Sequence, residues 1–175
     1  MSSTDFLVLS RASAAAADVD SAELTERHWS YMDRFADGMT ARGPLLDLAS
    51  ESWLGSMHVV ALPSFEAARS FVADEPYQRA GLFESHRILA FRNLLGRTMW
   101  EYAGAPDGRR FVALGSGPVA VPAEQLIVHG TLSDPATGAP AGFLACAQAP
   151  SREALDEWLG GLDAEVYDWE FGGRR

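Results

Sequence analysis

His28 and one of two acidic side chains, Asp74 or Glu75, could form a general-base pair. His28 recurs with Leu24 and Met32 at the three- and four-residue spacing of a helix, which places it on the apolar stripe. An imidazole on a buried stripe needs a hydrogen-bond partner, because burying it without one costs free energy. Asp74 and Glu75 come directly before a proline, and either carboxylate could orient the ring and make it a general base. The alternative is a structural histidine whose hydrogen bonds are satisfied in the core.

Five further side chains could line a substrate pocket beside this pair. Trp29 and Tyr31 lie next to the helical histidine in the chain, and Tyr77 follows the acidic turn. His58 lies within an apolar run and His86 precedes another, so each could add a polar group to the pocket. The aromatic side chains could equally be core packing, and the two histidines could be structural.

The composition excludes several other kinds of chemistry. All fourteen basic residues are arginines, so Schiff-base chemistry, an internal pyridoxal-phosphate linkage and a Walker-type phosphate loop are ruled out. Cys146 is the single cysteine, which excludes an internal disulfide and a cysteine zinc cage. The four histidines show no metal-ligand spacing, and no serine lies in a Gly-x-Ser-x-Gly elbow. We therefore expect neither a metal nor an organic cofactor.

Length and charge narrow the class of protein. The chain has 175 residues, enough for one large or two small domains with a real core. Its net charge of −10 argues against nucleic acid as a partner and against anionic membranes. No apolar run approaches the ~20 residues of a membrane span, and the start resembles no secretion signal. We expect a cytoplasmic protein, a monomer or a homodimer, whose partner is a small-molecule substrate.

Hydrophobic patterning predicts alternating strands and helices. Short apolar runs indicate strands at residues 5–10, 53–62 and 87–92. Asp20 and Glu23 form a plausible capping pair for a helix whose apolar stripe continues to Met39, with Gly43-Pro44 ending it. A second helix is predicted to begin after Ser64 and to end at residues 74–75, because the residue before a proline is disfavoured in a helix.

The second part of the chain repeats the first in shortened form. The matches are Phe6 with Phe111 at an offset of 105, Gly43 with Gly130 and Pro63 with Pro150 at 87, and Phe91 with Trp169 at 78. The shortened copy omits the helix that carries His28 and a segment matching residues 75–83. The predicted organisation is a first unit at 1–102, a linker at 103–109 and a shortened second unit at 110–175, the two packing sheet to sheet.

The first half resembles the YCII (YciI-like) family over about residues 5–100. The resemblance rests on an early strand, the helical His28, Gly43-Pro-Leu, the strand Ser56-Met-His-Val-Val and the segment from Ala73 to Glu84, Ala-Asp-Glu-Pro-Tyr-Gln-Arg-Ala-Gly-Leu-Phe-Glu. It implies an α+β fold in which ferredoxin-like units pair into a dimeric α+β barrel. It also implies a His/Asp dyad as active site and, in a few members, lyase activity such as dehydrochlorination. This chain departs from the pattern because Glu75, not an aspartate, precedes the proline, so Asp74 and Glu75 both remain candidates.

These observations predict an α+β protein of two tandem ferredoxin-like halves that form a barrel within one chain, the second half degenerate. We expect a cofactor-free lyase, isomerase or cyclase that uses His28 with Glu75 or Asp74 on a small apolar or aromatic substrate. The arginine- and alanine-rich composition is typical of a high-GC bacterium, where secondary metabolism is a plausible setting. The competing interpretation is a non-catalytic module that binds a small molecule or a partner on the same barrel.

Overall fold

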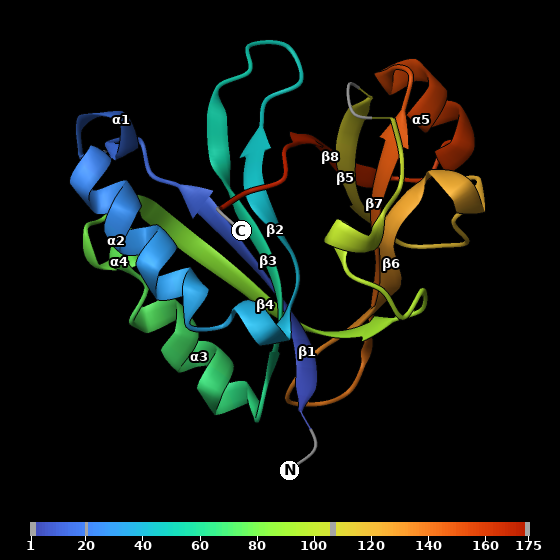
Figure 1. The fold of residues 1–175 in the computed structure, drawn as a ribbon. Coiled ribbons are helices and arrows are strands. Elements are labelled where there is room, and N and C mark those ends of the chain that lie inside the picture. Colours follow the sequence, from blue (N-terminus) through green and yellow to red (C-terminus); the bar gives the residue numbers. More distant parts are fainter. Residues whose placement is uncertain (1–2, 20, 106–107, 174–175) are drawn as a thin grey trace.

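The computed structural model describes residues 3–19, 21–105 and 108–173. In these residues eight antiparallel strands close into one barrel, in the order β1-β3-β2-β8-β5-β7-β6-β4 (Figure 1). The strands are β1 (Thr4–Ala12), β2 (Met39–Leu46), β3 (Trp53–Leu62), β4 (Phe83–Asn93), β5 (Arg109–Gly115), β6 (Leu126–Ser133), β7 (Pro140–Ala149) and β8 (Ala164–Trp169). The helices are α1 (Ala16–Val19), α2 (Ala22–Asp33), α3 (Phe65–Ala73), α4 (Pro76–Arg79) and α5 (Arg152–Leu159).

The barrel consists of two ferredoxin-like half-barrels in tandem. One holds β4, β1, β3 and β2, the other holds β8, β5, β7 and β6, and the pairs β2–β8 and β4–β6 join them. The helices α1 to α4 pack outside the first half, whereas α5 covers the second (Figure 1). The fold is therefore α+β, an intrachain version of a dimeric α+β barrel, as the sequence predicts.

Strand register relates the two halves. Phe6 pairs with Val60, and Phe111 pairs with Ala147, which are the positions that offsets of 105 and 87 require. The other pairs obey these two offsets together with the offset of 78: Phe6–Ala90 corresponds to Phe111–Asp168, Gly43–Met57 to Gly130–Leu144, and Leu45–Trp169 to Leu132–Phe91. Residues 116–125, all of them described, form only a 3-10 turn (Ala123–Gln125) where the first half has α1 and α2. The domain boundaries at 102 and 110 stay a prediction.

The first long helix is shorter than its apolar stripe predicts. Asp20 lies outside the described residues, and the side chain of Ser21 caps α2 by accepting a hydrogen bond from the Leu24 amide at 3.2 Å. The helix ends at Asp33, and a 3-10 turn (Ala36–Gly38) leads into β2. The expectation that the helix continues to Met39 and ends at Gly43-Pro44 is wrong, because that segment pairs with β3 as a strand.

The turn between α3 and α4 agrees with the patterning. Ser64 caps α3 by accepting from the Ala67 amide, and Asp74, directly after the last helical residue, is its C-cap. Glu75 is extended, as expected before proline, and it caps α4, whose first residue is Pro76. Asp74 thus follows the end of α3 at the surface, whereas the side chain of Glu75 is buried at the start of α4.

Apolar clusters inside and outside the barrel stabilise this arrangement. The barrel interior is filled by side chains from all eight strands, among them Leu7, Met57 and Trp169. A second cluster lies between the first half-sheet and helices α2 and α3, with Met32 and Phe71 at its centre. A third packs α5 against the second half-sheet. The outer face of the first half-sheet is thus a helix-covered layer, and the candidate site lies within that layer.

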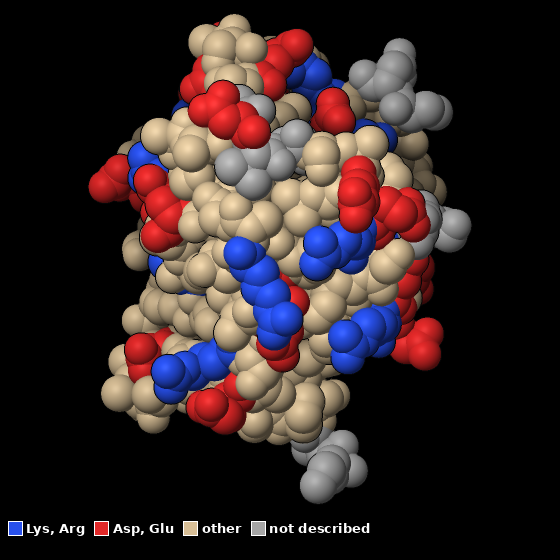
Figure 2. All heavy atoms as spheres, turned by 90° about the vertical axis from the view of Figure 1, so that its left-hand side faces the viewer, with Lys and Arg blue, Asp and Glu red and all other residues tan. Residues whose placement is uncertain are grey.

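Figure 2 shows arginines and acids interleaved on the helical face, where Arg69 pairs with Glu66 and Arg79 with Asp74. Among the described helices, none is both long and apolar enough to cross a membrane.

Candidate active site

The two helices over the first half-sheet bring a histidine against a carboxylate. His28 is on the buried face of α2, and Glu75 is the N-cap of α4. His28 Nδ1 lies 2.5 Å from Glu75 Oε1, and the two residues are only 9% and 4% exposed. This is a direct, solvent-shielded hydrogen bond between groups 47 positions apart in the chain.

The position of Glu75 follows from its place at a helix start. Its second oxygen, Oε2, accepts the backbone N–H of Gln78 at 2.8 Å, which is the N-cap hydrogen bond of α4. Pro76 at the first helical position holds the backbone in the required conformation. Both carboxylate oxygens are therefore occupied, one by the helix and one by the imidazole.

This geometry decides which ring nitrogen of His28 can act on a ligand. A carboxylate only accepts, so the proton of a neutral His28 is on Nδ1, which donates to Glu75. Nε2 is then the basic nitrogen, and no described residue forms a hydrogen bond with it. The ring also stacks on Tyr77, with centroids 4.2 Å apart and planes 3° from parallel. The Tyr77 hydroxyl donates to Thr25 Oγ1 at 3.0 Å, so the ring is held from two sides.

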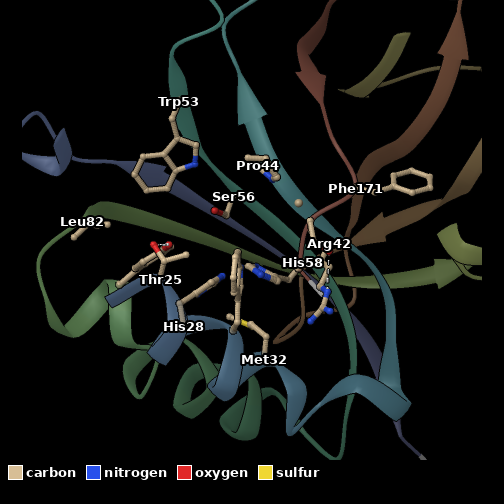
Figure 3. A pocket seen from close by; sticks show the side chains of 15 residues that line it. Thr25, His28, Met32, Arg42, Pro44, Trp53, Ser56, His58, Leu82 and Phe171 are labelled. Atoms are coloured by element: carbon tan, nitrogen blue, oxygen red, sulfur yellow. Dashed lines mark hydrogen bonds between the residues drawn. The ribbon is translucent and has the colours of Figure 1, made fainter. Parts of the chain in front are cut away.

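A pocket of about 440 Å³ opens beside His28, between α2 and the outer face of β2 and β3 (Figure 3). Aromatic side chains form much of its wall: Trp29, Trp53 and Tyr77. Phe171 also borders the pocket, but its ring points away from it and packs against the barrel interior (Figure 3). Its polar lining comes from Thr25, Ser56, His58 and Arg42, together with His28 itself. The pocket is large enough for a substrate of one or two rings and combines a mostly apolar wall with a few polar groups, as small-molecule sites do.

His58 is a neutral group in this pocket. Its ring centroid lies 6.0 Å from that of His28, and it is 4% exposed. Burial, with smaller contributions from His28 and Arg42, lowers the pKa of His58 to about 3. His58 therefore offers a hydrogen-bond donor or acceptor to a ligand without adding charge.

The candidate residues separate into three groups. His28, Glu75, Tyr77 and His58 are brought together, and Trp29 lines the same pocket. Asp74 lies at the surface, where it pairs with Arg79. Tyr31 was expected at the pocket and is instead in the core, because its hydroxyl donates to the Phe71 carbonyl at 2.9 Å.

His86 was also expected to line the pocket and lies one layer behind it. Its Nε2 lies 2.5 Å from Gln78 Oε1, and its Nδ1 lies 2.9 Å from the Ser10 hydroxyl. Since an amide oxygen only accepts, Nε2 of a neutral His86 carries the proton and Ser10 donates to Nδ1. Burial lowers the pKa of His86, although the charge of Glu75 opposes this shift. His86 thus supports Gln78, the residue whose backbone N–H donates to Glu75 Oε2.

Sequence reasoning missed Arg42, Trp53 and Phe171, which also line the pocket. Arg42 was missed because its segment was predicted to be the end of a helix. The Gly-Pro-Leu motif that follows it, part of the family resemblance, was the feature that could have drawn attention to this segment. Phe171 belongs to the second half and reaches the pocket only because the barrel closes. No local pattern could have placed it there.

No group of three or more His, Cys, Asp or Glu side chains that could hold a metal ion occurs in residues 3–19, 21–105 and 108–173.

Comparisons with known proteins agree with this architecture. Residues 4–92 match the model of the YCII-related domain. A mutant chlorite dismutase from Candidatus Nitrospira defluvii is 7% identical with a TM-score of 0.57, covering 97% of this chain and 93% of that one. A protein named provisionally as a chlorite dismutase is 17% identical with a TM-score of 0.56, covering 97% and 96%. At these identities the likeness shows the fold alone.

A dehydrochlorinase acting on 5-chloro-2-hydroxyhydroquinone, from Burkholderia phenoliruptrix, is also similar to one half of the chain. Its TM-score is 0.43 at 20% identity, and the match covers 48% of this chain and 89% of that one. No curated protein sequence matches the chain.

Proposed function

The chain belongs to the YCII-related domain family, and from this premise we propose that it is an acid/base enzyme acting on a small apolar or aromatic substrate through His28 and Glu75. The reaction class is elimination, isomerisation or cyclisation, each of which begins with removal of a proton by a base. The observation that carries the proposal is the 2.5 Å contact between His28 Nδ1 and Glu75 Oε1 at the wall of a pocket.

Each residue has a distinct role in the proposed step. Nε2 of His28 takes a proton from a substrate carbon, and the electron pair stays on the substrate. Those electrons then expel a leaving group, shift to a new position that is reprotonated, or form a ring bond. Glu75 accepts the Nδ1–H bond throughout and stabilises the imidazolium, because charge-assisted hydrogen bonds are stronger than neutral ones. Tyr77 stacks on the imidazole of His28 and keeps the two rings parallel.

The positions of the proposed catalytic groups support different roles for the two halves of the barrel. The proposed catalytic groups come from the predicted first unit, 1–102, and the helices that carry them have no counterpart among the described residues of the predicted second unit, 110–173. The second half contributes the closed barrel and Phe171 at the pocket wall. We therefore propose an internal duplication in which one copy keeps the site and the other completes its enclosure. A cytoplasmic location and a role in secondary metabolism belong to the same proposal and rest on composition.

The test is turnover by matched histidine variants. A panel of small cyclic and aromatic compounds bearing acidic C–H bonds is screened with the wild-type protein for loss of substrate. We expect turnover of at least one member, and His28→Gln should reduce it by about 10²–10⁴-fold, the usual contribution of a general base. His129→Gln is the control, because His129 lies in the second half with its Nδ1 2.9 Å from the Leu144 carbonyl.

The outcome also decides the competing function. If compounds bind saturably to the pocket but none is turned over, the protein is a non-catalytic binding module. Equal turnover by His28→Gln and wild type would remove His28 as the base while leaving the fold assignment intact.

A further inference from the structure

His58 is a buried side chain whose hydrogen-bonding groups the protein leaves unused. It lines the pocket beside His28 and is 4% exposed. Within residues 3–19, 21–105 and 108–173, no residue forms a hydrogen bond with either of its ring nitrogens. Burying a polar group without a partner costs free energy, and most buried polar groups in proteins are paired. An unpaired imidazole in the wall of a pocket therefore points to a ligand as its partner.

The ring nitrogens of His58 open to the pocket rather than to closed protein. In the described part of the chain, none of the polar side-chain atoms that are sealed off without a partner belongs to His58. Figure 3 shows His58 reaching from β3 into the same layer as His28, which projects from α2. The two ring centroids lie 6.0 Å apart, and the ring planes are inclined by 63°. A ligand beside Nε2 of His28 is thus within reach of His58.

The two imidazoles differ in what they offer to that ligand. His28 donates its Nδ1 proton to Glu75, so its Nε2 can only accept. Burial is the main cause that keeps the pKa of His58 near 3, so this ring is neutral at physiological pH and has one N–H group. Because no described residue accepts that N–H, His58 is a hydrogen-bond donor beside a base.

Ser56 adds a second donor to the same wall. It lies two residues before His58 on β3, so both side chains are on the same face of the strand. Its hydroxyl lines the pocket, and no residue in the described ranges forms a hydrogen bond with it. The helix wall therefore supplies the base and the sheet wall supplies neutral donors. This division matches a substrate in which an acidic C–H bond stands beside an oxygen that accepts hydrogen bonds.

We infer that the substrate is a carbonyl compound, and that His58 donates a hydrogen bond to its carbonyl oxygen while His28 removes a proton from the adjacent carbon. The carbonyl oxygen and the proton-bearing carbon are separated by a single atom, so two neighbouring rings can reach both. A neutral imidazole can polarise a carbonyl group in this way. The inference rests on the proposed function for the role of His28, whereas the hydrogen bond from His58 to a ligand carbonyl is independent of turnover.

The step balances without an oxidant or reductant. The proton moves to Nε2 of His28, the C–H electron pair forms a carbon–carbon double bond, and the carbonyl π pair moves onto oxygen. The N–H of His58 stays on its nitrogen and donates to the resulting enolate oxygen. The enolate then expels a leaving group from the next carbon, is reprotonated at another carbon by His28, or attacks an electrophilic carbon to close a ring. A donor aimed at an oxygen where charge develops contributes about 10²–10³-fold to the rate.

The binding test compares ketones with hydrocarbons of the same shape by isothermal titration calorimetry. The pairs are 2-tetralone with tetralin and 1-indanone with indane. A ketone oxygen only accepts, so a preference for the ketone reports a donor in the pocket. We expect the ketone of at least one pair to bind about fivefold more tightly than its hydrocarbon, as one neutral hydrogen bond provides.

Histidine variants assign this donor. His58→Phe should abolish the preference for the ketone, whereas His129→Phe should preserve it, because His129 lies in the second half with its Nδ1 2.9 Å from the Leu144 carbonyl. Circular dichroism establishes that each variant is folded, and His58→Leu replaces His58→Phe if the larger ring is not tolerated. If neither variant folds, the preference of the wild-type protein decides.

The turnover test uses the compounds consumed in the screen described above. We expect each of them to have a carbonyl group next to its acidic C–H bond. His58→Phe should lower kcat on such a compound by about 10²–10³-fold, and His58→Gln, whose side-chain amide retains an N–H donor, should lose less.

Equal or weaker binding of the ketone in both pairs, or a preference that survives in His58→Phe, would overturn the inference. Its failure is distinguishable from that of the proposed function. His28-dependent turnover of compounds without a carbonyl group, unaffected by His58→Phe, refutes the role of His58 and keeps the enzyme. A ketone preference that depends on His58, without turnover of any compound, keeps the hydrogen bond from His58 and refutes the enzyme.

Discussion

Replacing Glu75 by glutamine tests the proposed base without changing the size of the side chain. The two oxygens of Glu75 accept from Gln78 N–H and from His28 Nδ1–H. An amide has one accepting oxygen and a donating NH₂ group, so it cannot serve both donors. With its oxygen on the Gln78 amide, its NH₂ faces Nδ1 of His28, and that nitrogen must then accept.

The expected consequence is a change of tautomer. In Glu75→Gln the proton of neutral His28 moves to Nε2, the nitrogen that faces the substrate, and the ring can no longer accept a proton there. Loss of the charge-assisted hydrogen bond alone amounts to about 1.5–3 kcal/mol, which is about a 10- to 150-fold effect on the rate. The tautomer change adds to this, so we expect a loss of at least about 100-fold in kcat.

Two assays report on this variant separately. Nitrogen-15 NMR of the histidine rings reads the tautomer of His28 without any substrate, and steady-state kinetics measures kcat on a compound found in the screen. Asp74→Asn is the matched control, because it makes the same charge change one residue away, at an exposed side chain paired with Arg79. The reasoning is refuted if His28 keeps its proton on Nδ1 in Glu75→Gln, or if Asp74→Asn loses as much activity.

Three further predictions follow from the same geometry. His58 has a folded-state pKa of about 3 against 6.5 in the unfolded chain, so the unfolded chain binds more protons between these values. Stability should therefore fall as the pH drops below about 6.5, by up to about 1.4 kcal/mol per pH unit from this group. The free energy of unfolding, measured by urea denaturation at several pH values, should depend less steeply on pH in His58→Gln. Tyr31→Phe should lower stability by about 1 kcal/mol through its lost hydrogen bond to Phe71 and leave kcat unchanged, and a fall in kcat would place Tyr31 at the site after all. Because the barrel closes within one chain, sedimentation equilibrium should give a monomer of 18.9 kDa, and a mass of twice that value would contradict this expectation.

Much of the fold could be predicted because its signals are local or repeated. The strands β1 and β3 are apolar runs, and the offsets between the two copies reproduce the register of every strand pair compared above. The strand β2 was missed because Phe35 and Met39 continue the spacing of the α2 stripe. What makes this segment a strand is its long-range pairing with β3, and helical spacing contains no information about such pairing.

The candidate site could be predicted only in part, for a similar reason. His28 was singled out by its place on an apolar stripe, and Glu75 by its place before Pro76, so each had a local signal. The choice between Asp74 and Glu75 required the direction in which α4 leaves α3, which is a property of packing. Phe171 had no such signal, since it reaches the pocket only where the C-terminal segment crosses β2.

The most direct test of the central claim is chemical rescue of a histidine deletion. His28→Ala removes the proposed base and leaves space in a pocket of about 440 Å³ that free imidazole can enter. We expect this variant to be inactive and added imidazole to restore its turnover in proportion to the imidazole concentration, with no such dependence in His129→Ala. Full turnover by His28→Ala without imidazole would contradict the claim that His28 is the base.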